Sequence, residues 1–317
     1  MRAALIDEPG RPPRVADRPE PRAGEGEVVV SVTAAPITPL DRLCASGTSY
    51  FGVPRTPYVP GVQGVGRAAG RPVWFATSAG MRPGDGSMAE RACVPAADVV
   101  ELPAGADPVL VAALGLSAVA AEMALVWRGA LAAGEHVLVL GAGGVVGQAA
   151  VQLARAAGAG RVVAAARSAD ARGRARRHGA DAVVAVGSAG SDDVETLAER
   201  FRVACGDPVD LVLDPVFGVP AAAALRVLRP GGRLVNLGGS AGETAPIDSS
   251  TLRSRSLRIL GYTNNELTPE QRRAAVTRVA ELAVAGRLTV EHEPVPLADA
   301  AAAWSRTSAA RAVLIPR

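Results

Sequence analysis

The chain has 317 residues, of which 49% are hydrophobic and 21% charged, and its formal net charge at pH 7 is +3. This length exceeds the size at which one hydrophobic core is usual, so we expect two domains. No apolar run approaches the roughly 18 residues of a membrane span, and acidic residues stand near the N-terminus where a signal peptide needs an apolar stretch. We therefore expect a cytoplasmic protein with no membrane partner. Acidic and basic residues alternate along most of the chain, so no nucleic-acid partner is expected.

The N-terminal third of the chain is rich in Pro and Gly. Short β-type runs, such as 27–37 and 71–77, alternate there with turn signals and predict a small, mostly β domain. The segment 107–129 is long, rich in Ala and Leu, and free of proline after Pro108. These features favour a buried helix that connects two domains.

From residue 136 onwards, apolar strands and helices alternate regularly. Strands are expected at 136–141, 161–166, 182–186, 209–216 and 232–239, with helices at 148–158 and 170–179. Strands that are apolar throughout and separated by helices indicate a parallel sheet covered on both faces. A helix at 269–286 and a closing strand at 311–317 form the last segment. The predicted fold class is α/β.

A glycine-rich turn joins the strand 136–141 to the next helix. Such a turn, with the pattern G/A-x-G-x-x-G, binds the pyrophosphate of a dinucleotide: the middle glycine admits the phosphate, the last lets the helix pack closely, and the helix N-terminus supplies free N–H groups. Alanine fits the first position if its φ stays negative. The alternatives are a purely structural turn or a nucleoside ligand such as S-adenosylmethionine. The residues of this loop are Ala142, Gly143, Gly144, Val145, Val146 and Gly147.

The end of the second strand indicates which dinucleotide is bound. NAD sites usually place Asp or Glu there, about twenty residues after the loop, to bind the ribose hydroxyls, whereas this chain has Ala166. Arg167, Ser168 and Arg172 follow, and they offer two guanidinium groups and a hydroxyl to a 2′-phosphate. We therefore expect NADPH rather than NADH. The arginines at 174, 176 and 177 are interpreted as a solvated helix face, because no aromatic residues interleave with them.

The order of these elements resembles the medium-chain dehydrogenase/reductase superfamily over nearly the whole chain, and most closely its zinc-independent quinone oxidoreductase branch. The resemblance implies a Rossmann NADP-binding domain, residues 120–265, inserted in a GroES-like, mostly β catalytic domain formed by residues 1–119 and 266–317. The matching segments are TAAPITPLD (33–41), PYVPGVQGVG (57–66), AALGLSAVAAEMAL (112–125), VLGAGGVVGQAAVQLA (139–154), HGAD (178–181), VDLVLDPV (209–216), RPGGRLVNLG (229–238) and LRSRSLRILG (252–261).

The zinc ligands of the superfamily's alcohol dehydrogenases are not matched. Those enzymes place a cysteine shortly before the aspartate matched by Asp41, and a His-Glu pair after the glycine matched by Gly61, where this chain reads ITPLD and GVQG. The four-cysteine structural lobe is also absent, so we expect no metal. Without a Lewis acid an alkoxide is not stabilised, whereas quinones and α,β-unsaturated carbonyls accept hydride with the help of hydrogen bonds alone. The resemblance thus implies NADPH-dependent reduction of a small quinone or enone.

The resemblance also suggests substrate-site residues. Tyr50 stands in a loop where family members often carry a substrate-facing tyrosine, which can donate a hydrogen bond or a proton. Thr38 replaces a frequent Asn and Ala120 a frequent Thr, so donors near the nicotinamide are fewer or smaller. A tyrosine often found after the third Rossmann strand is replaced around Gly187 and Ser188. The candidates are Tyr50, Thr38 and Asp41 as catalytic residues, Gln63, Trp74 and Asn264 as substrate contacts, and Asn236, Gly238, Gly239 and Ser240 as nicotinamide contacts at the carboxyl edge of the sheet.

Other functions fit the same residues. One is an enoyl reductase that acts on a carrier-bound or CoA-linked intermediate; another is an NADPH-binding protein with a structural or RNA-binding role and little turnover. A methyltransferase that uses S-adenosylmethionine fits less well, because it also needs an acid after the second strand. By family analogy, the apolar strand 256–260 predicts a homodimer, since it would otherwise be an exposed sheet edge.

Overall fold

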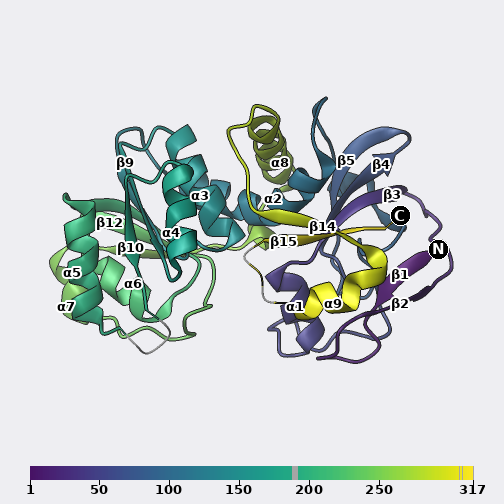
Figure 1. The fold of residues 1–317 in the computed structure, drawn as a ribbon, viewed down its shortest axis with the longest axis horizontal. Coiled ribbons are helices and arrows are strands. Elements are labelled where there is room, and N and C mark those ends of the chain that lie inside the picture. Colours follow the sequence, from purple (N-terminus) through teal and green to yellow (C-terminus); the bar gives the residue numbers. More distant parts are fainter. Residues whose placement is uncertain (188–191, 307, 309, 317) are drawn as a thin grey trace. The chain divides into compact units, whose positions relative to one another are not determined.

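The computed structural model describes residues 1–187, 192–306, 308 and 310–316, and it divides into two compact units (Figure 1). Unit 1 comprises Met1–Leu116 and Thr268–Arg317, and unit 2 comprises Ser117–Leu267. These limits lie within three residues of the domain boundaries expected from the sequence. Ser188, one of the positions compared with the family's tyrosine, lies outside the described residues.

Unit 1 is mostly β, and its main sheet follows the order β14-β15-β3-β4-β5-β7, with β6 paired to β3. The pairs are antiparallel except β14 with β15. In β3, Val30 and Val32 are buried while Ser31 between them is exposed, as alternation in a half-covered strand requires. The strands of this sheet are β3 (Glu27–Pro36), β4 (Gln63–Ala68), β5 (Arg71–Ala76), β6 (Arg91–Pro95), β7 (Val99–Glu101), β14 (His292–Pro296) and β15 (Arg311–Ile315).

The remaining elements of unit 1 surround that sheet. A separate antiparallel pair is formed by β1 (Arg2–Leu5) and β2 (Arg14–Asp17). One core contains residues from the first pair, from the main sheet and from the C-terminal segment, for example Leu5, Phe75 and Trp304. The helices are α1 (Pro39–Ser46), α8 (Pro269–Val284) and α9 (Ala300–Ser305), with short 3-10 turns at Ala96–Asp98 and Leu297–Asp299.

Unit 2 contains a parallel sheet in the order β10-β9-β8-β11-β12-β13. Counted along this unit, the order is the 3-2-1-4-5-6 arrangement of a Rossmann fold, and it reverses between β8 and β11. The predicted α/β fold class with a parallel sheet is confirmed. The strands are β8 (His136–Val139), β9 (Arg161–Ala166), β10 (Ala182–Ala185), β11 (Val209–Asp214), β12 (Leu228–Asn236) and β13 (Arg258–Gly261).

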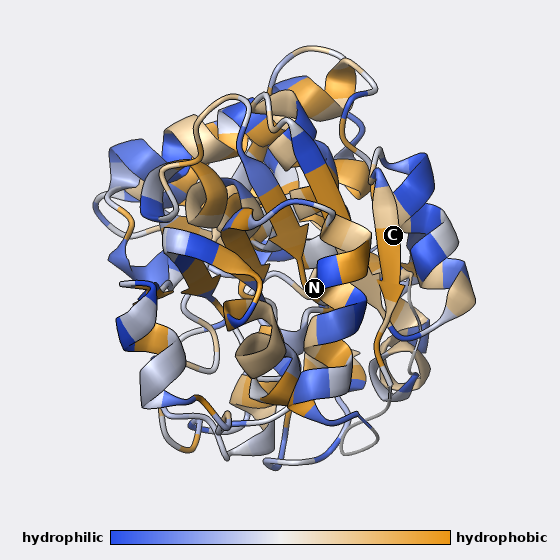
Figure 2. Cartoon of the chain, turned by 90° about the vertical axis from the view of Figure 1, so that its left-hand side faces the viewer, coloured by the Kyte–Doolittle hydropathy of each residue, from blue (hydrophilic) through white to orange (hydrophobic). Residues whose placement is uncertain are grey.

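The strands of this sheet are apolar because helices cover it. Figure 2 shows strands coloured as hydrophobic between helices that carry both hydrophilic and hydrophobic residues. One core cluster joins Leu138, Val163 and Val212 of the sheet to Phe201 and Leu225 of two helices. The helices are α3 (Val145–Ala156), α4 (Ala169–Arg177), α5 (Val194–Cys205), α6 (Gly218–Leu225) and α7 (Ser249–Ser254), with a 3-10 turn at Asn264–Glu266.

The helix that links the units differs from the sequence expectation. α2 (Pro108–Met123) is interrupted at Gly115, where φ is 32° and ψ −136°, and it continues as a π-helix at Ala124–Arg128. Within the 21-residue segment Pro108–Arg128, the most apolar window of 18 residues has a mean hydropathy of 2.2, so the expectation that no apolar run approaches the length of a membrane span was wrong. Of its most apolar window 67% is buried, as in a core helix, and a single such helix is weak evidence for a membrane span.

Candidate cofactor and substrate sites

The phosphate loop follows β8 at the point where the strand order of the parallel sheet reverses. The left-handed turn residue is Gly141, with φ 62°, while Ala142 has a negative φ as its side chain requires. The Ala142 N–H donates to the carbonyl of Ala165 at 2.9 Å, which ties the loop to the end of β9. Ligands of such sheets bind outside the carboxyl ends of the strands at this position.

Two glycines shape the loop in different ways. A Cβ on Gly147 would lie 2.4 Å from the Gly141 carbonyl oxygen and 2.6 Å from Ala142 Cα, so the close approach of α3 requires glycine. A Cβ on Gly144 would meet its nearest atom only at 3.8 Å, so the space beside Gly144 is free of protein. Gly144 also caps α3 without a side-chain hydrogen bond, which leaves the N–H groups of the first turn to bind an anion.

The residues predicted to bind a 2′-phosphate meet at the carboxyl end of β9. Ser168 caps α4, and its hydroxyl oxygen accepts a hydrogen bond from the Ala171 N–H at 3.1 Å. Arg172 reaches back to donate to the carbonyl of Ala166 at 3.2 Å and to that of Arg167 at 2.5 Å. The Arg167 side chain is exposed. Two guanidinium groups and a helix N-terminus therefore create a positive site directly after the strand that lacks the acid.

The solvated face expected for the next arginines is only partly present. Arg176 and Arg177 are exposed, but Arg174 is 8% exposed and belongs to the buried side of α4. The helix period explains the difference, because Arg174 lies three residues after buried Ala171 and shares its face.

The carboxyl ends of β11 and β12 hold a network that the sequence reasoning missed. Asp214 is 0% exposed and accepts hydrogen bonds from the N–H groups of Val216 and Phe217 at 3.0 and 2.8 Å. The Asn236 side-chain amide donates to the Asp214 carboxylate at 3.0 Å and to the Gly238 carbonyl at 2.8 Å. The available signal was an acidic residue at the end of an apolar strand, in VDLVLDPV. Nicotinamide contacts for Asn236, Gly238, Gly239 and Ser240 stay a prediction.

In unit 1, Thr38 and Asp41 form a buried capping box at the start of α1. The Asp41 carboxylate accepts from the Thr38 N–H at 2.7 Å, from its hydroxyl at 2.6 Å and from the Val62 N–H at 2.8 Å. Burial raises the pKa of Asp41, and these hydrogen bonds oppose the rise. Because the carboxylate is only 2% exposed and joins two backbone segments, its contacts indicate a positioning role, and direct participation in catalysis stays a prediction.

Gln63 and Trp74, the predicted substrate contacts in unit 1, lie together but are buried at 1% and 0% exposure. The Gln63 side-chain oxygen Oε1 accepts from the Trp74 indole N–H at 3.0 Å and from the Leu116 N–H at 2.6 Å. A Cβ on Gly115 would lie 2.1 Å from that same oxygen. The Gln63 side chain therefore fills the break in α2, which explains the interruption of the helix.

The remaining candidates belong to different units. Tyr50 follows α1 in unit 1 and is 78% exposed, with its ring 4.2 Å from that of Phe51. In unit 2 the side-chain oxygen of Asn264 accepts from the Tyr262 hydroxyl at 2.7 Å. Burial raises the pKa of Tyr262, so this phenol stays protonated as the donor. Substrate contacts by Tyr50 and Asn264 stay predictions.

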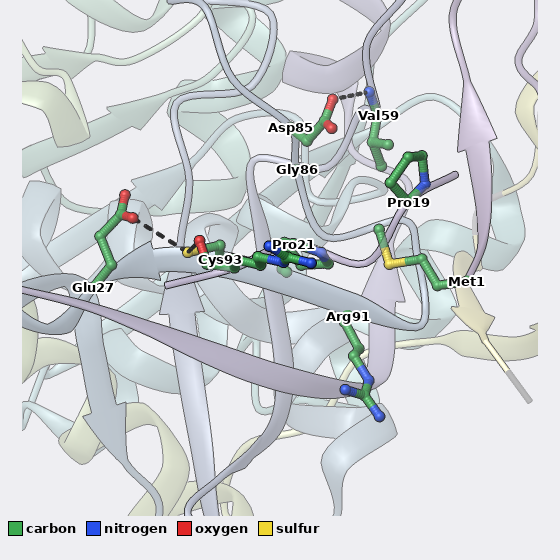
Figure 3. A pocket seen from close by; sticks show the side chains of 11 residues that line it. Met1, Pro19, Pro21, Glu27, Val59, Asp85, Gly86, Arg91 and Cys93 are labelled. Atoms are coloured by element: carbon green, nitrogen blue, oxygen red, sulfur yellow. Dashed lines mark hydrogen bonds between the residues drawn. The ribbon is translucent and has the colours of Figure 1, made fainter. Parts of the chain in front are cut away.

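A surface hollow of about 310 Å³ lies in unit 1 (Figure 3). Asp85 and Cys93 line it, with Asp85 accepting from the Val59 N–H at 2.9 Å and the Cys93 thiol donating to Glu27 at 3.5 Å. None of the sequence-predicted site residues borders this hollow. Within the described ranges, no group of three or more His, Cys, Asp or Glu side chains is arranged to hold a metal ion.

A Rossmann sheet with a glycine loop at its reversal point, joined to a mostly β unit, defines a two-domain dehydrogenase or reductase architecture. The family described as "Zinc-binding dehydrogenase" matches residues 145–281. The quinone oxidoreductase of Lama guanicoe is 30% identical over 270 residues, which cover 80% of this chain and 78% of that protein. The chain belongs to the quinone oxidoreductase family of the medium-chain dehydrogenase/reductase superfamily and is an oxidoreductase, so the resemblance seen in the sequence is confirmed.

Two further similarities bear on cofactor and substrate. The solved quinone oxidoreductase of Thermus thermophilus, also solved as its complex with NADPH, is 32% identical with a TM-score of 0.81; the match covers 99% of this chain and 100% of that one. A mycocerosic acid synthase-like polyketide synthase of Mycobacterium tuberculosis is 32% identical over 220 residues, which are 68% of this chain but 10% of that protein.

Proposed function

We propose that this protein is a zinc-independent, NADPH-dependent reductase of small quinones or α,β-unsaturated carbonyls. The observation that carries the cofactor assignment is the end of β9, where Ala166 takes the place of the acid and Arg167 and Arg172 follow. A carboxylate at this point would repel a 2′-phosphate, whereas guanidinium groups bind it with charge-assisted hydrogen bonds. The NADPH complex of the Thermus relative supports the same assignment.

The three groups at the end of β9 have different parts in this proposal. One terminal nitrogen of Arg172 donates to two backbone carbonyls. These hydrogen bonds hold the guanidinium group in place, and its other N–H groups can donate to the phosphate. Arg167 is exposed and free to close over the phosphate. The Ser168 hydroxyl oxygen accepts from the Ala171 N–H, and its O–H group can donate to a phosphate oxygen.

Single substitutions test the cofactor preference. Arg167→Ala and Arg172→Ala should each weaken NADPH by about 10- to 100-fold and leave NADH nearly unchanged, because a charge-assisted hydrogen bond contributes roughly 1.5–3 kcal/mol. Arg177→Ala, on the same helix and exposed, is the control and should change neither cofactor. Fluorescence titration of each cofactor measures the dissociation constants. Equal weakening of NADPH and NADH, or wild-type protein that binds NADH as tightly, would contradict the proposal.

The acceptor class follows from the residues that replace the zinc ligands. NADPH, when bound, supplies a hydride; the electron pair displaced in the substrate moves to a conjugated oxygen, which then takes a proton. The segments ITPLD and GVQG, which stand where the alcohol dehydrogenases have zinc ligands, contain no thiolate or imidazole, and Asp41 is engaged with backbone N–H groups. Tyr50, exposed and able to donate a proton, is our candidate for the group that assists the oxygen.

The metal content is a separate test. Purified protein should hold no stoichiometric zinc, and a chelator should leave its NADPH-dependent reductase activity unchanged, because a tetrahedral site needs several Cys, His or carboxylate ligands. Elemental analysis of the purified protein measures this directly. About one zinc per chain would overturn the zinc-free part of the proposal but not the cofactor preference.

The enoyl reductase alternative is favoured by one observation, the similarity to a stretch of a polyketide synthase. A panel that contains simple quinones, small enones and CoA-linked enones, followed at the NADPH absorbance, separates the possibilities. Turnover of CoA-linked enones alone would favour the alternative. Binding of NADPH without turnover of any acceptor would favour a structural or RNA-binding role.

A further inference from the structure

The loop that follows β11 is built around a buried carboxylate. Asp214 accepts from the Val216 and Phe217 N–H groups through one oxygen and from Asn236 through the other. Burial raises the pKa of Asp214, and these three donors oppose the rise. Such a group is retained in an apolar interior only when its hydrogen bonds are made.

The same carboxylate holds an unfavourable backbone conformation. Phe217 has φ 56° and ψ −154°, in a region that residues with a side chain rarely adopt. The N–H group that donates to Asp214 at 2.8 Å is that of Phe217 itself. Without the carboxylate, we expect the backbone at Phe217 to relax to a conformation of lower energy.

The loop after β11 packs directly on the loops after β8 and β12. A Cβ on Gly141, in the phosphate turn, would lie 2.7 Å from a methyl of Val216. A Cβ on Gly238 would lie 2.7 Å from the Pro215 carbonyl oxygen, and the Ala241 N–H donates to the Val216 carbonyl at 2.7 Å. A shift in residues 215–217 would therefore displace both neighbouring loops.

We propose that Asp214 is a positioning residue of the cofactor site. Its carboxylate fixes residues 215–217, and through Asn236 it fixes residues 237–240, so that the loops at the reversal point are ordered before the dinucleotide binds. This inference rests on the proposed NADPH binding. Asp214 does not touch the cofactor; it acts through the three loops.

Asp214→Asn is the test, and Asp210→Asn is its matched control. The control makes the same change at the opposite end of β11, where Asp210 accepts from the His136 N–H at 2.7 Å. Asp214→Asn replaces a charged acceptor with a weaker neutral one for the amides at 216 and 217, and it sets an NH2 group against the NH2 group of Asn236. It should therefore weaken NADPH by about tenfold and speed hydrogen exchange of the amides at 216 and 217 by a similar factor. Asp210→Asn should lower the melting temperature but leave the NADPH affinity within about twofold and exchange at 216 and 217 unchanged.

The exchanged pair Asp214→Asn with Asn236→Asp should recover part of the affinity, because an amide at 214 can still accept from residues 216 and 217 and donate to a carboxylate at 236. If Asp214→Asn does not fold, Asn236→Ala should loosen residues 237–240 and weaken NADPH by about threefold. Unchanged affinity and exchange in Asp214→Asn would overturn the inference, as would an equal loss of affinity in Asp210→Asn. Failure of the wild type to bind either nicotinamide cofactor would instead contradict the proposed function, and exchange at 216 and 217 would still test the anchoring.

Discussion

Gly144 and Gly147 show how a single loop requires glycine for two opposite reasons. At Gly147 the neighbouring backbone leaves no room, since a Cβ would lie 2.4 Å from the Gly141 oxygen. At Gly144 there is open space, with the nearest atom 3.8 Å from an added Cβ. Gly147 therefore serves protein packing, and Gly144 serves ligand approach.

Alanine at each position should separate these roles. Gly147→Ala should destabilise the fold by about 3 kcal/mol and weaken NADPH, because backbone atoms must move. Gly144→Ala should cost roughly 0.5–1 kcal/mol of stability, the difference between Gly and Ala at a helix N-cap, yet weaken NADPH at least about tenfold. Thermal melts and cofactor titration measure both quantities. Tight NADPH binding by Gly144→Ala would show that the pyrophosphate does not approach there.

Among the elements, β13 is one of the two edge strands of the parallel sheet. It ends the parallel sheet and pairs with β12 on one side, with Ile259 39% exposed. Among the strands that the structure describes, β12 alone pairs with it. An open edge of this kind can join another strand.

We expect β13 to pair with its symmetry mate and form a homodimer. Ile259→Lys should shift the protein toward the monomer, since a charged side chain on an edge strand opposes strand pairing. Val203→Lys, which replaces a 75% exposed apolar residue on α5, is the control and should stay dimeric. Light scattering at micromolar concentration measures the mass. A monomeric wild type would contradict the prediction.

α2 illustrates how an element differs from its sequence pattern. Composition favours a continuous helix over 107–129, since Ala and Leu are good helix formers. The structure breaks it at Gly115, because the Gln63 side chain, 53 positions from Leu116 in sequence, occupies the adjacent space. A local pattern contains no information about that contact.

At the scale of the whole molecule, a buried charge network joins distant segments of unit 2. Arg233 is 4% exposed and donates to the Glu135 carboxylate at 2.7 and 2.5 Å, and to the carbonyls of Gly129 and Ala130. Burial raises the pKa of Glu135, but hydrogen bonds from Arg233 and from the Ala132 N–H outweigh it, and the net pKa is below the usual range.

A lowered carboxyl pKa predicts loss of stability in acid. The contribution of Glu135 is fully present above the ordinary glutamate pKa of about 4.3 and is lost as the pH falls through the lower pKa of the folded state. Asp41 and Asp214, whose pKa values are raised, act in the opposite sense and reduce the net loss.

Arg233→Met should destabilise the protein by about 2–3 kcal/mol at pH 7, because Glu135 loses its two hydrogen bonds from Arg233 and keeps only the longer ion pair with Arg229 and the Ala132 N–H, and the difference from wild type should shrink below about pH 4. Arg202→Met, which removes an exposed pair with Glu199, should cost less than about 1 kcal/mol at any pH. Melts between pH 3 and pH 7 measure this dependence. A constant difference across that range would contradict the linkage to Glu135.

Features that depend on residues close together in the chain could be predicted from the amino-acid sequence. The apolar run after Gly160 located β9 at residues 161–166, and the glycine spacing located the phosphate loop. The missing acid at Ala166 and the arginines after it could also be read directly, because a strand end and the next helix start are adjacent in the chain.

Contacts between segments that are distant in sequence could be identified only in the folded structure. Asn236 meets Asp214 across 22 positions, and Arg233 meets Glu135 across 98. It also showed that Trp74, a predicted substrate contact, is fully buried. The physical reason is that burial and hydrogen-bond partners are set by which elements pack together, while periodicity and turn residues specify only the elements themselves.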